Sequence, residues 1–316
     1  MMIELEQVTK LYKTVIGVNE ITLSLGEGTY GLLGPNGSGK TTLINLILGQ
    51  LQPTLGSVKL FGLNPWRKSK LLRQVGLCPA MEVTYPRVTG LDWVTYMTQM
   101  HGFSFSTAEK MAKEALEKVS LTYAMNRPMR NYSLGMRQRA KIAQAISHDP
   151  KLLILDEPFN GLDPVGRFEM TEFLKGWAIG GKSLILASHI LHEVEAVNPS
   201  FLLISGGRLL ASGSPTEVRQ ILADSPYTLH IQCSEAKKLV SILIEQCDIE
   251  SVKFSSDTKF EIATRKASEI FDILPTLIES HGLSVSEISS TDDSLKTLFS
   301  TLMKMHRGEM NRGIGV

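Results

Sequence analysis

The chain has 316 residues, of which 43% are hydrophobic and 21% charged, and this ordinary composition excludes a fibre and a disulfide-held miniprotein. Its 33 lysine and arginine residues against 32 acidic residues leave a net charge of +1. Because such a chain has no strong overall field to attract polyanions, we expect no nucleic acid among its partners. The three cysteines have neither zinc-site spacing nor an even count, and we interpret them as buried thiols of a cytosolic protein.

The first half of the chain combines strand-like runs with helical segments. Ile3–Val8 and Ile21–Leu25 predict a small antiparallel β region, and Tyr30–Leu33 predicts a further strand. The apolar run Leu43–Leu48 predicts a buried helix. Residues 84–148 show helical periodicity and few β-branched runs, so we expect a helical insertion there.

Continuous apolar runs then indicate a parallel sheet. Leu152–Leu155 and Leu184–Ala187 have strand length without alternation, which is typical of strands that helices cover on both faces. Residues 1–222 are therefore expected to form an α/β domain. No stretch approaches the roughly 18 uninterrupted apolar residues of a membrane-spanning helix, so we expect any membrane association to depend on a partner.

A second domain is predicted at residues 226–305, because the pattern breaks around Asp224–Pro226 and a new alternation follows. The order strand, helix, strand, strand, helix, strand fits a small α+β ferredoxin-like domain. The predicted elements are the strands Tyr227–Cys233, Ile249–Phe254, Lys259–Thr264 and Leu283–Ser289 and the helices Ala236–Glu245 and Ala267–Glu279. We expect Ser294–Met305 to form a closing helix and residues 306–316 to be a disordered tail.

A phosphate-binding loop is predicted between the strand at Tyr30–Leu33 and the helix that follows. Gly34–Thr41, GPNGSGKT, matches the pattern G-x-x-x-x-G-K-[ST], whose backbone amides and helix N-terminus bind phosphate oxygens. Lys40 would contact the β and γ phosphates, and the Thr41 hydroxyl would ligate Mg2+. The alternative is a glycine-rich turn with a solvated lysine. The predicted nucleotide-binding residues here are Gly34, Asn36, Gly37, Ser38, Gly39, Lys40, Thr41 and Thr42.

Two buried strands end in polar side chains. Lys151–Glu157, KLLILDE, presents two carboxylates at its end, where ligands of parallel sheets bind. Asp156 is the predicted Mg2+ carboxylate, usually through water, and Glu157 the predicted catalytic group that orients or deprotonates the attacking water. His189 follows the next strand and would sense the γ-phosphate. The alternatives are an ordinary strand terminus and a structural histidine.

A second anion-binding helix N-terminus is predicted at Tyr132–Arg139, YSLGMRQR, where Ser133 is placed as the N-cap. The motif resembles the LSGGQ signature of ABC transporter ATP-binding subunits, and Asn160–Asp163, NGLD, resembles their D-loop. The resemblance covers residues 1 to about 222. It implies a P-loop NTPase cassette with a mixed-sheet core, and ATP and Mg2+ as cofactors.

The resemblance also implies a head-to-tail dimer, in which each ATP is bound by the phosphate loop of one chain and the signature of a second ATP-binding subunit. When the family's residue roles are carried over position by position, Tyr12 would stack on adenine. Without the resemblance, Tyr12 would be interpreted as a surface aromatic. Ser133 and Gly135 would bind the opposite γ-phosphate. Asp163 would communicate between the two sites, and His189 would hold the γ-phosphate.

The sequence departs from the family pattern at two positions. Leu134 replaces the first signature glycine, which is tolerable because the flanking serine and glycine remain. Ala80 stands where the family has a glutamine that touches Mg2+ and the attacking water, and Glu82 is a candidate replacement. Further along, Trp93, Met97 and Met100 share one helix face, which indicates either the core of the insertion or the groove that receives a permease helix.

The resemblance implies an ATP hydrolase that powers a separate transmembrane permease and lies at the cytoplasmic face of the cell membrane. The forms YSLGMRQR and NGLDP and the C-terminal extension resemble exporter-type subunits, which move drugs, lipids or polymers. One alternative is a soluble ABC ATPase acting on ribosomes or DNA, but those usually carry two cassettes. Another is a regulatory module with weak turnover that is not coupled to transport. The alanine at position 80 favours this alternative, and the intact carboxylate of Glu157 argues against it.

Overall fold

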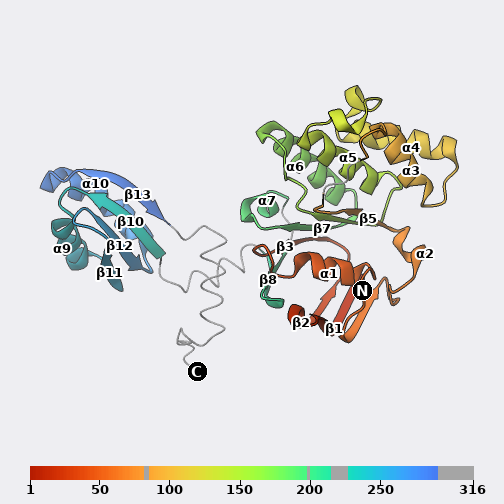
Figure 1. The fold of residues 1–316 in the computed structure, drawn as a ribbon. Coiled ribbons are helices and arrows are strands. Elements are labelled where there is room, and N and C mark those ends of the chain that lie inside the picture. The colour runs from red at the N-terminus through yellow and green to blue at the C-terminus, as the bar shows by residue number, and fades with distance from the viewer. Residues whose placement is uncertain (82–84, 198–199, 215–226, 291–316) are drawn as a thin grey trace. The chain divides into compact units, whose positions relative to one another are not determined.

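The computed structural model describes residues 1–81, 85–197, 200–214 and 227–290. The chain divides into two compact units, Met1–Pro215 and Thr216–Val316 (Figure 1). The expected α/β core with an antiparallel β region and a helical insertion is confirmed in the first unit.

The first unit contains a six-stranded sheet with the order β5-β6-β7-β3-β8-β9. All neighbouring strands in it are parallel except β8 and β9. Both β6 and β7 are buried along their whole length, as their continuous apolar runs predict. The strands are β3 (Thr29–Leu33), β5 (Val75–Cys78), β6 (Leu152–Asp156), β7 (Ser183–Ser188), β8 (Ser200–Ser205) and β9 (Arg208–Gly213).

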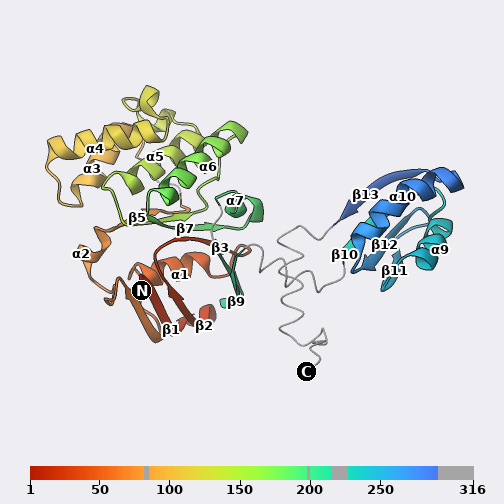
Figure 2. The same ribbon diagram turned by 180° about the vertical axis from the view of Figure 1, so that it is seen from behind.

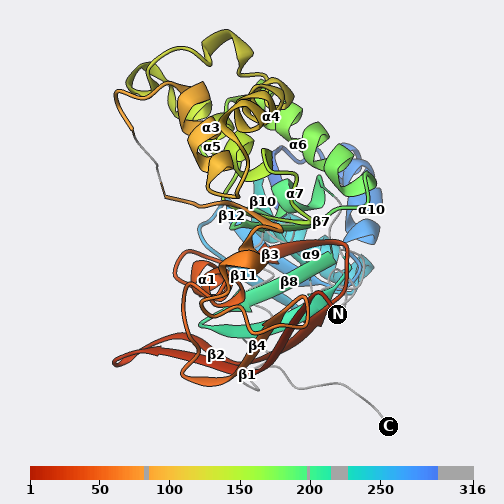
Figure 3. The same ribbon diagram turned by 90° about the vertical axis from the view of Figure 1, so that its right-hand side faces the viewer.

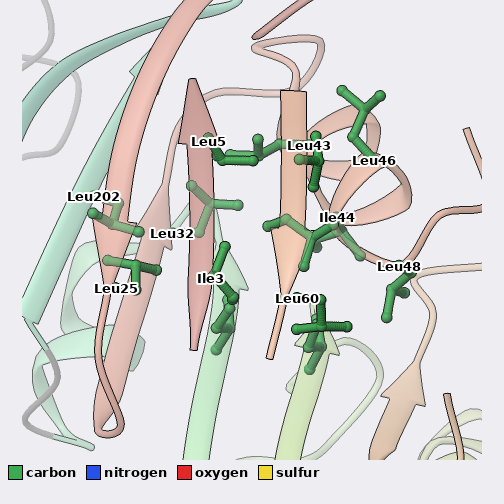
Figure 4. Packing of buried hydrophobic residues seen from close by; sticks show 14 of the residues in the cluster. Ile3, Leu5, Leu25, Leu32, Leu43, Ile44, Leu46, Leu48, Leu60 and Leu202 are labelled. Atoms are coloured by element: carbon green, nitrogen blue, oxygen red, sulfur yellow. The ribbon is translucent and has the colours of Figure 1, made fainter. Parts of the chain in front are cut away.

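A smaller antiparallel sheet has the order β2-β1-β4, and α1 lies between it and the larger sheet (Figures 1 and 3). Apolar side chains from both sheets and from α1 pack into one core, as the labelled leucines and isoleucines of Figure 4 show. This packing fixes the start of α1 against the end of β3. The elements are β1 (Ile3–Tyr12), β2 (Val15–Leu25), β4 (Leu55–Leu60) and α1 (Lys40–Ile47).

Several boundaries in this region differ from the prediction. The strands β1 and β2 are longer than expected, because register shifts and the positive φ angles of Gln7 (48°) and Glu20 (51°) interrupt the alternation. Helix α1 begins at Lys40 rather than at Leu43, since the phosphate loop leads directly into its first turn. The strands β4, β8 and β9 were not predicted.

The helical insertion packs on one side of the larger sheet (Figure 1). Thr89 and Ser104 cap α3 and α4 through their hydroxyl groups. Trp93 is 3% exposed and belongs to the core, whereas Met100 is 67% exposed, so the helix face proposed from sequence is divided between core and surface. The insertion contains α3 (Gly90–Gln99), α4 (Phe105–Lys118), η1 (Thr122–Ala124), η2 (Met129–Asn131) and α5 (Leu134–Ile146). The remaining helices of the first unit are α2 (Ser69–Leu72), α6 (Pro164–Ile179) and α7 (Leu191–Glu195).

The second unit contains an antiparallel sheet of order β11-β12-β10-β13, with α9 and α10 packed on one face (Figure 2). Together with the chain order, this is the ferredoxin-like arrangement that the sequence predicts. The strands β11 and β13 each begin two residues later than predicted. The predicted closing helix and tail lie outside the described residues. The elements are β10 (Tyr227–Cys233), α9 (Ala236–Gln246), β11 (Ser251–Phe254), β12 (Lys259–Thr264), α10 (Ala267–His281) and β13 (Val285–Ser290).

The cysteines are free thiols with different exposure. Cys78 and Cys233 are buried, as predicted, but Cys247 is partly exposed. Burial raises the pKa of the Cys78 thiol to about 12, so this group stays protonated and unreactive at neutral pH.

None of the helices in the described parts of the chain is long and apolar enough to cross a membrane.

Candidate functional site

A pocket of about 330 Å3 lies over the phosphate loop. It gathers residues from β1, β2, the phosphate loop, α1 and the ends of β5 and β6. Most of the predicted nucleotide-binding residues line it. The lining residues are Tyr12, Val15, Ile16, Gly17, Asn36, Gly37, Ser38, Gly39, Lys40, Thr41, Thr42, Ala80, Asp156 and Glu157.

The phosphate loop runs from the end of β3 into α1, and its glycines are required by geometry. Gly37 and Gly39 have φ angles of 78° and 108°, in the region that favours glycine. A Cβ atom at Gly34 would collide with the carbonyl oxygen of Ile204. The Ser38 hydroxyl is buried and has no hydrogen-bond partner within the described structure, so it is available to a ligand.

Lys40 and Glu157 line this pocket, and His189, which is not among the lining residues, contacts Glu157 from outside it. The Lys40 Nζ donates to the carbonyl oxygen of Gly34 at 2.6 Å and lies 3.6 Å from Glu157 Oε1. The other carboxylate oxygen, Glu157 Oε2, is 2.9 Å from His189 Nδ1. Since Glu157 Oε1 is buried without a hydrogen-bond partner in the described structure, it can accept a hydrogen bond from a ligand or water.

The backbone at the end of β6 explains why two neighbouring acids line the same pocket. Successive side chains of a strand point to opposite faces. Strand β6 ends at Asp156, and Glu157 has a φ of 54°, in the left-handed region. This unusual conformation breaks the alternation, and both carboxylates reach the pocket.

The residues present fit a magnesium ion. The Thr41 hydroxyl donates to Asp156 Oδ2 at 2.7 Å, close to the roughly 3 Å between neighbouring ligands of an octahedral Mg2+ ion. Burial raises the pKa of Asp156, against the lowering effect of the Thr41 hydrogen bond, and a cation would offset that penalty. The described residues contain no group of three His, Cys, Asp or Glu side chains suited to a metal ion.

A second pocket of about 520 Å3 contains the signature residues. The Ser133 hydroxyl caps α5 by accepting from the Met136 amide at 3.2 Å. The Asp163 carboxylate caps α6 by accepting from the Gly166 amide at 3.0 Å. Gly135 lines the same pocket, so the predicted signature and D-loop residues come together, but in a pocket that shares no residue with the first.

Leu134, the departure from the signature, packs against the D-loop. Gly161 has a φ of 77°, and a Cβ atom there would collide with the Leu134 side chain. The small residue at 161 therefore accommodates the large residue at 134. The sequence alone gives no sign of this contact.

Tyr12 and Ala80 lie at the pocket rim, and Glu82 is outside the described residues. Tyr12 is 41% exposed and its ring lies beside Gly17, where it can meet a planar ligand. Ala80 lines the pocket as its sequence position predicts. Two further polar residues of α5, Gln138 and Lys141, are buried and were not predicted as site residues. Lys141 had a signal in the sequence, because it stands between Ala140 and Ile142, whereas Gln138 stands between two arginines and had none.

Comparisons with known proteins agree with this geometry. The ABC transporter family matches residues 18–160. An uncharacterized ABC transporter ATP-binding protein of Nostoc sp. is 37% identical over 234 residues, which are 71% of this chain and 68% of that protein. The bacitracin transport ATP-binding protein BcrA of Bacillus licheniformis is 31% identical over 304 residues, 95% of this chain and 97% of that protein. A solved structure of an ATP binding subunit of an ABC transporter has a TM-score of 0.63 at 26% identity, and the match covers 70% of this chain and 92% of that one.

Fold and site together define a P-loop ATPase of the ATP-binding cassette type. The chain belongs to the ABC transporter family as an ATP-binding subunit. It is therefore an ATP-binding ATPase subunit of a transporter.

Proposed function

We propose that the pocket over the phosphate loop binds ATP with Mg2+ and hydrolyses it through Glu157. The observation that carries this proposal is the position of Glu157, which lines the pocket and keeps one buried oxygen free of hydrogen bonds while His189 lies 2.9 Å from the other. A carboxylate held in this way can orient water and accept its proton. Mg2+, when bound through Thr41 and Asp156, would neutralise charge on the phosphates.

The other residues of the pocket have supporting roles in this proposal. Lys40 attracts the β and γ phosphates, and the free amides of the phosphate loop bind their oxygens. His189 contacts the γ-phosphate and keeps Glu157 in position. Tyr12 stacks on the adenine ring.

Two copies are proposed to associate head to tail, so that Ser133 and Gly135 of one chain complete the nucleotide site of the other. The support is the separation of the two pockets within one chain, since the signature pocket has an anion-binding helix end without the phosphate loop. Asp163 at the base of α6 lies in the same pocket and would communicate between the sites.

The partner is proposed to be a transmembrane permease that holds this subunit at the cytoplasmic face of the membrane. The support is a group of exposed aromatic and methionine side chains on and beside α3, which suits an adaptable docking groove. These residues are Tyr85, Tyr96, Met100, Phe103 and Phe105. Export of a drug, lipid or polymer is the proposed direction and substrate class, and relatives named for bacitracin transport and linearmycin resistance favour a drug.

The domain at 226–305 is proposed to stabilise the dimer and to carry no catalytic residue. All the nucleotide-contacting residues named above come from the first unit. A chain truncated after Leu222 should still bind ATP in an equilibrium titration, with weaker association or altered turnover. Loss of all ATP binding by a folded truncation would contradict this division.

The alternative is a regulatory ATPase with weak turnover that is not coupled to transport, which Ala80 in the nucleotide pocket favours. Two measurements separate the proposals. Purification of the tagged chain from membranes should recover a permease, and ATP turnover should depend on Mg2+ and rise in the recovered complex. Membrane-free recovery with unchanged, slow turnover would support the regulatory role.

A further inference from the structure

Lys141 is a buried cation in the middle of α5. Lys141 is only 3% exposed. The Nζ donates to the carbonyl oxygens of Pro79 at 2.9 Å and of Met81 at 3.1 Å. These two carbonyls flank Ala80, the residue that lines the nucleotide pocket where the family has its glutamine. One ammonium group therefore holds the chain on both sides of Ala80.

A structural role alone does not account for a lysine at this position. Burying an ammonium group is costly unless strong partners receive it, and an apolar side chain of similar volume is often equally stable or more stable. The ammonium also acts on a neighbouring thiol. Burial raises the pKa of Cys78 and the charge of Lys141 opposes this rise, so the charge is felt at the end of β5.

The position of Lys141 along α5 also connects it to the signature pocket. The helix begins in the signature pocket, where Ser133 is its N-cap, and Lys141 lies roughly 12 Å further along the axis at about 1.5 Å per residue. One turn before Lys141, the Gln138 Nε2 lies 3.5 Å from the Glu157 carbonyl oxygen. A single rigid helix thus joins the signature pocket to the loop and the strand end of the nucleotide pocket.

We propose that Lys141 is a positioning residue that fastens the Pro79–Met81 loop to α5 and so links the signature end of this helix to the nucleotide pocket. The alanine at position 80 removes a polar side chain from that loop, and the lysine holds the loop backbone from below. Displacement of α5 at its signature end moves the loop with it. This inference rests on the proposed nucleotide site and goes beyond it by assigning the link to a residue outside the known motifs.

The test compares three variants of the full-length protein. Lys141→Met keeps the volume of the side chain without its charge or donors, and Lys141→Arg keeps both charge and donors. Lys175→Met on the surface of α6 is the matched control, since its partner Glu172 is also exposed. Each variant is measured for ATP affinity by equilibrium titration, for turnover, and for hydrogen exchange at the Ala80 and Met81 amides.

We expect Lys141→Met to keep its ATP affinity but to lose about tenfold to a hundredfold in turnover, as misplaced catalytic surroundings do. Exchange at Ala80 and Met81 should become faster, and Lys141→Arg should recover most of the turnover. Unchanged turnover and exchange in Lys141→Met, or a loss of affinity equal to the loss of turnover, would overturn the proposal. If the methionine variant does not fold, Lys141→Gln must show a partial loss of turnover with faster exchange, and wild-type behaviour again overturns the proposal. Absence of Mg2+-dependent turnover in the wild type would instead count against the proposed nucleotide site.

Discussion

The helices α1 and α5 both present their N-termini to a pocket, but they differ in how that end is capped. At α1 the cap position is Gly39, with a φ of 108° and no side chain, so the first amides of the helix stay open. At α5 the Ser133 hydroxyl already accepts from an amide of its own helix. Open amides beside a lysine make a strong phosphate site, whereas a capped helix end offers a weaker one.

The side chains around the two helix ends also favour tighter phosphate binding at α1 than at α5. Lys40 and Thr41 at the start of α1 contact Glu157 and Asp156 within the same chain. The signature pocket is larger, about 520 Å3 against 330 Å3. Binding is therefore expected to depend on the α1 pocket alone, and the signature pocket is expected to matter only once two chains meet.

The largest expected effect concerns hydrolysis in the α1 pocket. Glu157→Gln removes the carboxylate that we propose accepts a proton from water, so turnover should fall about a thousandfold while ATP affinity is retained. ATP-loaded protein should then accumulate as a dimer in analytical ultracentrifugation. Glu172→Gln on the exposed face of α6 is the control. Near-normal turnover of Glu157→Gln would refute the assignment.

The next effect concerns binding in the same pocket. Lys40→Ala removes a buried charge that we propose binds the phosphates, and it should weaken ATP binding about a hundredfold. Equilibrium titration measures this directly. Lys59→Ala, which removes an exposed lysine paired with Glu4 on the small sheet, should leave the affinity unchanged. Equal affinities for the two variants would show that the pocket does not bind phosphate through Lys40.

A smaller effect is expected in the signature pocket. Ser133→Ala should lower turnover about tenfold through one lost hydrogen bond to the opposite nucleotide, and it should not change ATP affinity at low protein concentration. The loss of an N-cap also costs about 1 kcal/mol of stability. Ser104→Ala removes the equivalent cap of α4 outside the pocket and controls for that cost. If both variants lose turnover equally, the signature serine acts only as a cap.

The parts of the site that the sequence predicts are those that lie in short contiguous motifs. The phosphate loop and the acids at Asp156 and Glu157 are short contiguous motifs, and the rule that ligands bind at the carboxyl ends of parallel strands places them together. The positive φ of Glu157 and its buried oxygen without a hydrogen-bond partner are tertiary features without a local signal. The contact of Lys141 with Pro79 and Met81 joins segments distant in the chain. Pattern reasoning cannot find such pairs.

The strands, too, could be predicted only where the sequence carries a local pattern. Buried strands such as β6 were predicted because an unbroken apolar run needs no register to be visible. The beginning of β2 was missed because the bulge near Glu20 shifts the side chains that face the core. Strand β8 carries the buried apolar run Phe201–Ile204 and pairs in parallel with β3, so its signal was present in the sequence and was overlooked. Strand β9, RLLASG, closes the sheet by antiparallel pairing with β8 and has no buried apolar run.

The smallest expected effect concerns Ala80, which lies in the α1 pocket but sits on the loop that Lys141 fastens to α5. A methyl group cannot ligate Mg2+ or orient water. If the link runs through the loop backbone, a side chain at position 80 is dispensable in the isolated subunit. Ala80→Gln should then change the turnover of the isolated subunit by no more than about twofold to threefold.

The assembled complex separates the remaining explanations. Ala80→Gln should alter turnover more with the permease bound than without it, because a glutamine there would add a contact that moves with the loop. Glu82→Ala tests whether that carboxylate has taken over the role of the missing glutamine, in which case turnover falls much more than ATP affinity. The measurement is the turnover of both variants with and without permease. Indifference of all four values would show that neither side chain takes part in coupling, and it would leave the backbone contacts of Lys141 as the link between the two pockets.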